Sequence, residues 1–145
     1  METVFKHFND LSLKELYEIL QLRCHVFIVE QTCPYLDIDD KDEDAYHLYF
    51  REDGKIIAYL RLLKQGVSYK EASIGRVICI KRREGIGTRL MLEGIKRIKE
   101  VYHPLSIRIG AQLYALSFYE GVGFKQVSEP YLEDDIEHIE MLLEF

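Results

Sequence analysis

The chain has 145 residues, of which 48% are hydrophobic and 30% charged, a balance that suits one globular domain with its own core. Its 19 basic and 25 acidic side chains give a net charge of −6, which disfavours nucleic acid as a partner and favours a cationic substrate. No run of about 18 apolar residues exists, so no membrane partner is expected. The three cysteines lack the spacing of a zinc site, so we expect reduced thiols, no metal and a cytoplasmic location.

The first third of the chain predicts a strand, a helix and a loop. The strand is expected over residues 3–8. Ser12 and Glu15 then form a capping box, and the apolar face that follows predicts a helix through about residue 27. Proline and dense acidic residues predict a loop over residues 32–45.

The rest of the chain alternates strand and helix patterns. The mostly apolar strand over residues 72–80 is expected at the centre of the sheet. The longest helix is expected over residues 86–101, where apolar side chains recur at helical spacing. The remaining predictions are strands at residues 47–51, 55–63, 105–109, 124–127 and 138–145, and a helix at residues 113–121. This order predicts a single α/β domain.

A glycine turn, Gly85-Ile86-Gly87, joins the apolar strand to the longest helix. It is not a phosphate loop, because no Lys-Ser/Thr follows the glycine, and Leu90 stands where a dinucleotide fingerprint needs its third glycine. The pattern that remains is Arg82-x-x-Gly85-x-Gly87, whose glycines and helix N-terminus suit an anion such as pyrophosphate. A plain strand-to-helix turn with a solvated basic run explains the same residues, and the turn alone leaves both readings open.

A second motif follows further along the chain, at Gln112, Ala115, Phe118, Tyr119, Gly123 and Phe124. The two motifs, in this order, resemble those of the GNAT superfamily of acetyl-CoA-dependent N-acyltransferases, which carries [RQ]-x-x-G-x-[GA] and then N-x-x-A-x-x-[FL]-Y-x-x-x-G-F. Residues 22–48 and the ending YLEDDIEHIEM look like the ElaA-like branch. Two departures from the pattern are Gln112, which stands where the family usually has Asn, and a loop after Cys79 that is shorter than usual.

The resemblance implies an α/β (α+β) fold, with a mixed, mostly antiparallel sheet flanked by helices and its fourth and fifth strands parallel and splayed. It implies one acetyltransferase domain over residues 1–145. The co-substrate would be acetyl-CoA, and the acetyl group would pass directly to a primary amine of a small molecule or peptide. Homodimers are frequent in this superfamily.

The resemblance also implies which residues bind the cofactor. The pyrophosphate would lie on the backbone of the glycine turn, and the pantetheine arm would pair with the strand before it, where one N–H group would polarise the thioester carbonyl. The implied residues are Val77, Ile78, Cys79, Arg82, Arg83, Glu84, Gly85, Ile86, Gly87, Thr88 and Gln112. Cys79 is not expected to act as a nucleophile, because no motif places a base beside it.

Tyr119 maps onto the family's general acid, since a phenol of pKa ~10 can donate to a thiolate whose acid has a pKa of ~8.5. A packing aromatic is the alternative. For the general base we favour Glu30 and then His47, while an acid of residues 37–44 and a water relay stay open. Each candidate base also has an ordinary structural explanation.

The acidic run DIDDKDED, residues 37–44, fails the calcium-loop pattern because it lacks the glycine. It fits either an electrostatic mouth for a cationic amine or a solvated loop. The leading function is therefore N-acetyl transfer. The alternatives are a degenerate GNAT module that binds acyl-CoA without turnover and a non-catalytic α/β scaffold.

Overall fold

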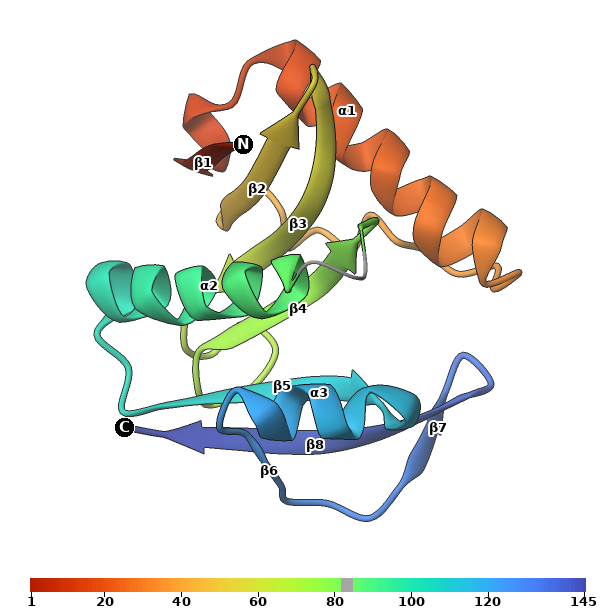
Figure 1. The fold of residues 1–145 in the computed structure, drawn as a ribbon. Helices are drawn as coiled ribbons and strands as arrows, with labels where there is room; N and C mark the ends of the chain where they lie inside the picture. The colour runs from red at the N-terminus through yellow and green to blue at the C-terminus, as the bar shows by residue number, and fades with distance from the viewer. Residues whose placement is uncertain (82–84) are drawn as a thin grey trace.

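The computed structural model describes residues 1–81 and 85–145 (Figure 1). The described residues form eight strands: β1 (Glu2–His7), β2 (Tyr46–Glu52), β3 (Lys55–Leu63), β4 (Ser73–Cys79), β5 (Ser106–Gln112), β6 (Lys125–Gln126), β7 (Tyr131–Glu133) and β8 (Ile136–Glu144). The helical segments are η1 (Phe8–Asp10), α1 (Leu13–Arg23), the π-helical η2 (Cys24–Glu30), α2 (Ile86–Tyr102), η3 (Leu113–Ala115) and α3 (Leu116–Gly121).

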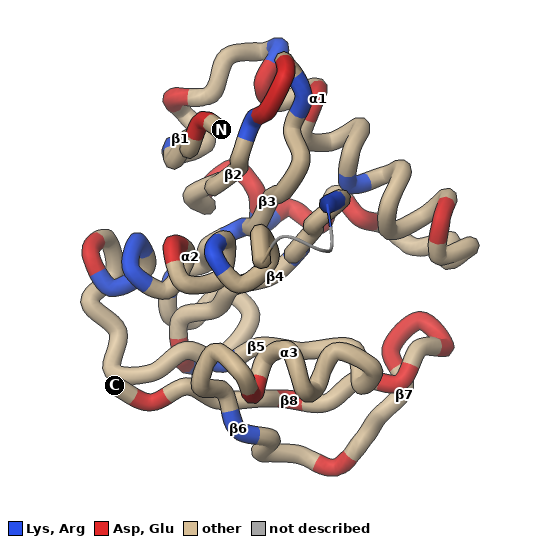
Figure 2. The backbone as a smooth tube through the Cα atoms, in the orientation of Figure 1, with Lys and Arg blue, Asp and Glu red and all other residues tan. Residues whose placement is uncertain are grey.

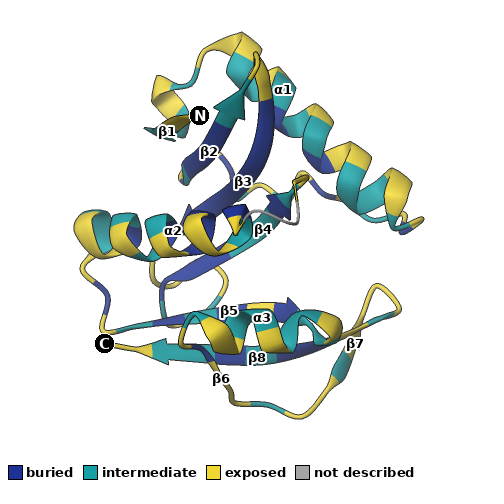
Figure 3. Ribbon diagram, in the orientation of Figure 1, coloured by how far each residue is buried: buried dark blue, intermediate teal, exposed yellow. Residues whose placement is uncertain are grey.

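The first sheet is antiparallel, in the order β1-β2-β3-β4, and is covered on both faces. Side chains alternate between the faces of a strand, so β3 sends Leu60 into the core on the α2 side and Tyr59 into a second core that includes Ile19 of α1. Coverage on both sides explains why β3 is buried along almost its whole length (Figure 3). A strand buried in this way reads as a continuous apolar run.

The second sheet has the order β5-β8-β6, with β7 paired to the other end of β8. Ile109 of β5 and Met141 of β8 share one core with Leu90 and Ile98 of α2. The two sheets therefore pack around a common apolar core, with α3 lying beside β5 and β8 (Figure 1).

The two sheets meet where β4 and β5 begin side by side. Ala72, just before β4, forms a parallel bridge with Ile107, and the Arg108 N–H donates to the Ala72 carbonyl at 3.0 Å. The strands then diverge, which gives the splayed parallel pair within a mostly antiparallel fold and confirms the predicted fold class. The strand expected at the centre of one sheet, β4, is instead the edge of the first sheet beside this gap.

The largest differences from the sequence-based expectation are in three places. Helix α1, with its capping box from Ser12 to Glu15, ends at Arg23, and the chain continues to Glu30 in π-helical turns. Segment η3 is a 3₁₀ turn that precedes the shorter helix α3. Strand β7 was not predicted, because three mostly exposed residues carry no alternating apolar pattern.

Gly94 allows α2 to approach the first sheet closely. A Cβ atom at this position would lie 2.9 Å from Cδ2 of Leu60 and 3.5 Å from Cδ1 of Ile74. Gly94→Val should lower the free energy of unfolding by about 1–3 kcal/mol, because the added methyl groups overpack this contact. Gly121→Val is the matched control, since a Cβ there meets nothing within 4 Å. Denaturant titration of both variants measures the difference, and equal losses would contradict the close contact.

Candidate active site

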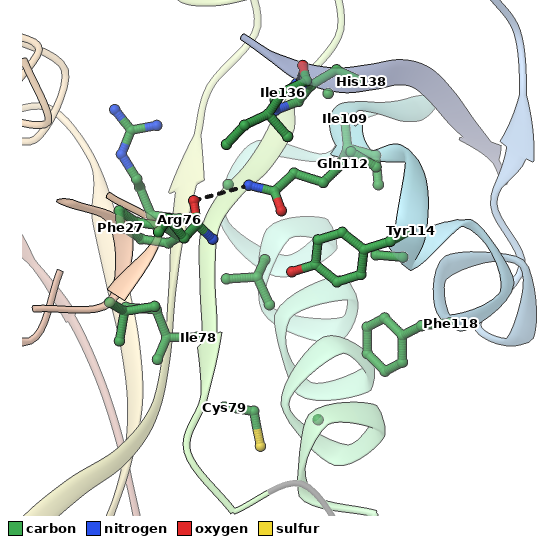
Figure 4. A pocket seen from close by; sticks show the side chains of 18 of the residues that line it. Phe27, Arg76, Ile78, Cys79, Ile109, Gln112, Tyr114, Phe118, Ile136 and His138 are labelled. Carbon is green, nitrogen blue, oxygen red and sulfur yellow. Dashed lines mark hydrogen bonds between the residues drawn. The ribbon is translucent and has the colours of Figure 1, made fainter. Parts of the chain in front are cut away.

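A cavity of about 800 Å³ lies in the gap between β4 and β5. Its walls come from η2, β4, the start of α2, the end of β5, α3 and the β7–β8 hairpin. Figure 4 shows Cys79 at one end of the cavity and His138 at the other, with Arg76 and Gln112 between them. The divergence of β4 and β5 therefore opens a cavity that has the β4 backbone on one side and side chains on the other.

A β-bulge shapes the β4 wall. The register of β4 against β3 shifts, so that Tyr59 pairs with Ile78 but Arg61 pairs with Gly75. Arg76 has a φ of +52°, a left-handed conformation that is uncommon for a residue with a side chain. A bulge bends its strand and increases the local twist, which turns β4 away from β5. Gly75 within a strand was a sequence signal for this irregularity.

The side chain of Arg76 is held by the acidic loop. Its Nε lies 2.8 Å from Oδ1 of Asp37, and its Nη2 donates to Oδ2 of Asp39 at 3.2 Å. The guanidinium also lies 5.6 Å from the centre of the Tyr35 ring. Although Arg76 lines the cavity, its positive charge is thus largely compensated.

Two further arginines bind the same loop. Arg23 at the end of α1 is fully buried, donating from Nε to Asp37 at 2.9 Å and from Nη1 to Asp42 at 2.5 Å. Arg61 of β3 donates hydrogen bonds from both Nη atoms to the Asp39 carboxylate, at 2.8 and 2.9 Å. The acidic run is therefore neither an open, negatively charged entrance for a cationic amine nor simply a solvated loop. Its buried aspartates neutralise the protein's own arginines, while Asp40, Glu43 and Asp44 remain exposed.

This ion-pair network changes the acidity of its members. Burial raises the pKa of Asp39, but hydrogen bonds and charges from Arg61 and Arg76 outweigh that effect and lower the pKa to about 2. The pKa of Asp42 is likewise lowered, because Arg23 and Arg61 outweigh its burial. Both carboxylates are therefore ionised throughout the neutral range.

The glycine turn leads into α2 as expected. Gly85 is the N-cap with a φ of +69°, which glycine adopts without strain, and α2 begins at Ile86. Ile86 buries its side chain in the core, so only its backbone is available to a ligand. A Cβ at Gly87 would lie 3.5 Å from Phe118, so these two residues of the lining face each other closely. Arg82, Arg83 and Glu84 lie outside the described residues.

The other predicted cofactor residues line the cavity. Val77, Ile78 and Cys79 form the β4 wall, with Thr88 beside them. The Cys79 thiol donates to the Lys81 carbonyl at 2.9 Å, and none of the three cysteines, all within the described chain, forms a disulfide. Gln112 ends β5 and donates from Nε2 to Oε1 of Gln31 at 3.2 Å (Figure 4).

Tyr119 reaches the cavity from α3. Its ring makes edge contacts with Phe118 and Phe124, at centroid distances of 5.1 and 6.1 Å. Burial raises the pKa of Tyr119 well above the usual range of a phenol, and the neighbouring Tyr114 adds to this effect. Tyr119 is therefore fully protonated near neutral pH and has an O–H group to donate.

The structure brings only one of the two expected bases to the cavity. Glu30 lines it from the end of η2, with 53% of its side chain exposed and its Oε1 3.2 Å from Nε2 of His25. His47 is almost fully buried elsewhere, with Nδ1 2.8 Å from the Tyr59 hydroxyl and Nε2 3.1 Å from the Asp42 carbonyl. Burial lowers the pKa of His47, so it is a neutral structural histidine of the ion-pair region.

Sequence reasoning missed some residues of the cavity. His138 lines it from β8 and Tyr114 from η3. His138 stood in the ElaA-like ending, but the hairpin that turns it inward was not predicted. Acidic residues lie on both sides of the cavity, on the β7–β8 turn and at the end of η2 (Figure 2).

Among residues 1–81 and 85–145, no group of three or more His, Cys, Asp or Glu side chains is placed to hold a metal ion. In the same part of the chain, every helix is too short or too polar to cross a bilayer.

A family model described as an acetyltransferase (GNAT) domain matches residues 14–145. Protein ElaA of Escherichia coli is 39% identical over 142 residues, which cover 95% of this chain and 93% of ElaA. The crystal structure of ElaA covers 99% of this chain with a TM-score of 0.92 and 38% identity, over 100% of its own length. An acyl-CoA N-acyltransferase from Pseudomonas aeruginosa has a TM-score of 0.91 and 40% identity, covering 99% of both chains. A UPF0039 protein of Schizosaccharomyces pombe is 41% identical, covering 99% of this chain and 97% of its own.

The lowered pKa of Asp39 predicts a loss of stability in acid. A carboxylate with a folded-state pKa of about 2 against a usual 3.8 contributes stability above pH 4 that disappears as the pH falls towards 2. Asp39→Asn removes this titration, and its free energy of unfolding at pH 7 should be lower by about 1–2 kcal/mol.

Unfolding by urea at several pH values between 7 and 2 would measure this effect. The variant keeps part of the acid sensitivity, because Ser12, Tyr49 and Lys6 outweigh burial and also lower the pKa of Glu15 to about 2. Asp40→Asn is the control, since Asp40 is exposed and its φ of +64° suits asparagine. If Asp39→Asn and Asp40→Asn show the same pH dependence, the ion pairs of Asp39 do not stabilise the fold.

Proposed function

Because the chain belongs to the GNAT acetyltransferase family, in its ElaA-like branch, we propose that it transfers an acetyl group from acetyl-CoA directly to a primary amine of a small molecule or peptide. The observation that carries this proposal is the splayed gap between β4 and β5, which forms a cavity running to the first turn of α2. A cytoplasmic location fits cysteines that form no disulfide.

The walls of the cavity suit two parts of CoA, the pantetheine arm and the pyrophosphate. Past the bridge at Ala72, the edge of β4 diverges from β5, and the amide groups of pantetheine can pair with such an edge as an added strand does. An α-helix leaves its first N–H groups without intrahelical partners, so the turn at Gly85 and Gly87 offers donors to the pyrophosphate. No lysine is needed where backbone amides bind the anion.

The β4 backbone would also serve the reaction. An N–H group of Val77, Ile78 or Cys79 that points into the gap would donate to the thioester oxygen as negative charge develops there. The bulge at Arg76 matters here because it changes which backbone groups face the gap. Gln112, held by Gln31 across the cavity, would support the same part of the ligand through its amide.

Tyr119 would donate a hydrogen bond and then a proton to the departing CoA sulfur. Its raised pKa keeps the hydroxyl protonated, so it has a hydrogen bond to offer the developing thiolate, and Phe118 and Phe124 pack against its ring. Glu30, which lies at the exposed edge of the cavity, would attract a cationic amine, and its role as the general base stays a prediction.

The experiment that tests this function is an assay of CoA thiol release from acetyl-CoA with a panel of primary amines. Tyr119→Phe should keep the fold and lower kcat by about 100-fold or more, because a leaving-group donor is lost. Tyr17→Phe is the matched control, since Tyr17 is exposed on α1, far from the cavity lining. Near-full activity of Tyr119→Phe would remove the tyrosine from the mechanism. Binding of acetyl-CoA without CoA release from any amine would favour the non-catalytic alternative.

A further inference from the structure

His138 lines the end of the cavity that lies opposite Cys79. It sits on β8 directly opposite Gln112 of β5, so the two side chains project from the same face of the sheet. The residue is only 8% exposed, yet it lines the cavity, at the far end from Cys79 (Figure 4). An acceptor amine entering beside β8 would therefore meet this imidazole.

The backbone fixes which ring nitrogen carries the proton. Nδ1 lies 2.7 Å from the carbonyl oxygen of Ile136. A carbonyl only accepts hydrogen bonds, so Nδ1 must be the donor. In the neutral ring the lone pair is then on Nε2, and Nε2 is the nitrogen that can accept a proton.

The surroundings of Nε2 favour a cation. Oε2 of Glu133 is 3.5 Å away, too far for a good hydrogen bond, and 60% of that side chain is exposed. The Tyr131 ring stacks on the imidazole at 6.0 Å and 27°, which holds the ring in place. Other titratable side chains near this end of the sheet are Tyr69, Arg108, Tyr114, Asp134 and Glu140, of which Arg108 and Glu140 form an ion pair at 2.9 Å.

We propose that His138 is the general base of the acetyl transfer, and that Glu133 binds the substrate ammonium beside it. This inference rests on the function proposed above, and it adds a catalytic residue that the motifs do not indicate. A primary ammonium group can donate one hydrogen bond to Nε2 and a second to the Glu133 carboxylate.

The step balances without any further reactant. One ammonium proton moves to Nε2, and the freed nitrogen lone pair forms a bond to the thioester carbon while the C=O electron pair moves onto oxygen. As that pair returns, the C–S bond breaks and the sulfur leaves as thiolate. The attacking nitrogen loses a second proton, which replaces the one that Tyr119 gives to sulfur, and its third hydrogen stays on the amide. The imidazolium then releases its proton to solvent.

His138 suits this role better than Glu30. The carboxylate of Glu30 is half exposed and already paired with His25, so water competes for its contacts. His138 is enclosed, its tautomer is set by Ile136, and Glu133 stabilises the imidazolium that forms. The arrangement places an imidazole base and a carboxylate anchor side by side.

The test compares pH–rate profiles of the full chain, His138→Gln and Glu30→Gln with one cationic amine. His138→Gln should lower kcat/KM by about 100-fold at pH 7 and lose the acidic limb of the unaltered protein, while its affinity for acetyl-CoA stays the same. Glu30→Gln should keep that limb. The proposal is overturned if His138→Gln retains the limb, or if the limb moves with Glu30→Gln.

A second measurement does not depend on turnover. Long-range ¹H–¹⁵N spectra of the histidine rings report the tautomer, and the neutral ring of His138 should carry its proton on Nδ1. A neutral ring with its proton on Nε2 would overturn the base assignment, even in an active protein. Absence of CoA release by the unaltered protein with every amine would instead overturn the proposed transferase function, and the base role with it.

Discussion

The buried ion pairs between one loop and three arginines set the geometry of the candidate site. Arg23, Arg61 and Arg76 come from α1, β3 and β4, and each binds an aspartate of residues 37–42. Removing one partner from a fully buried pair, such as Arg23 with Asp37, leaves an uncompensated charge and typically costs about 3–5 kcal/mol. The network is therefore a strong constraint on position, even if its net contribution to stability is small. It ties the end of α1, the loop and the β4 bulge into one wall of the site.

The gap between β4 and β5 depends on that wall. The two strands are joined at Ala72 and Ile107, and the bulge that Arg76 anchors turns β4 away from its neighbour. Most of the proposed chemistry then comes from position: backbone N–H groups for the carbonyl and the phosphates, and one donor for the sulfur. A site of this kind suits a direct transfer, because orienting the amine against the thioester supplies much of the rate enhancement.

The sequence predicted the elements whose signals are local. The capping box at Ser12 and the glycine turn before α2 are both present, because each depends on residues a few positions apart. The motif residues Gln112 and Tyr119 also line the cavity. The π-helical end of α1 and the edge position of β4 were not predictable, since both follow from contacts between distant parts of the chain.

The roles of the polar residues were even harder to predict from the sequence, because they too depend on contacts between distant parts of the chain. The acidic run was interpreted from charge alone, whereas its structural role comes from arginines that lie 14 or more residues away. His47 and His138 look alike in the sequence, yet one is buried in the ion-pair region and the other faces the cavity. Only the three-dimensional arrangement separates a structural histidine from a candidate base.

The most direct test of the account is calorimetric titration of acetyl-CoA into the full chain and into Gly87→Trp, with Leu92→Trp on the exposed face of α2 as the control. We predict micromolar binding to the unaltered protein and to Leu92→Trp, and loss of binding in Gly87→Trp, because the indole would fill the space beside Phe118 that we propose for the cofactor. No binding to the folded, unaltered chain, or equal binding to Gly87→Trp, would show that the gap between β4 and β5 is not the cofactor site.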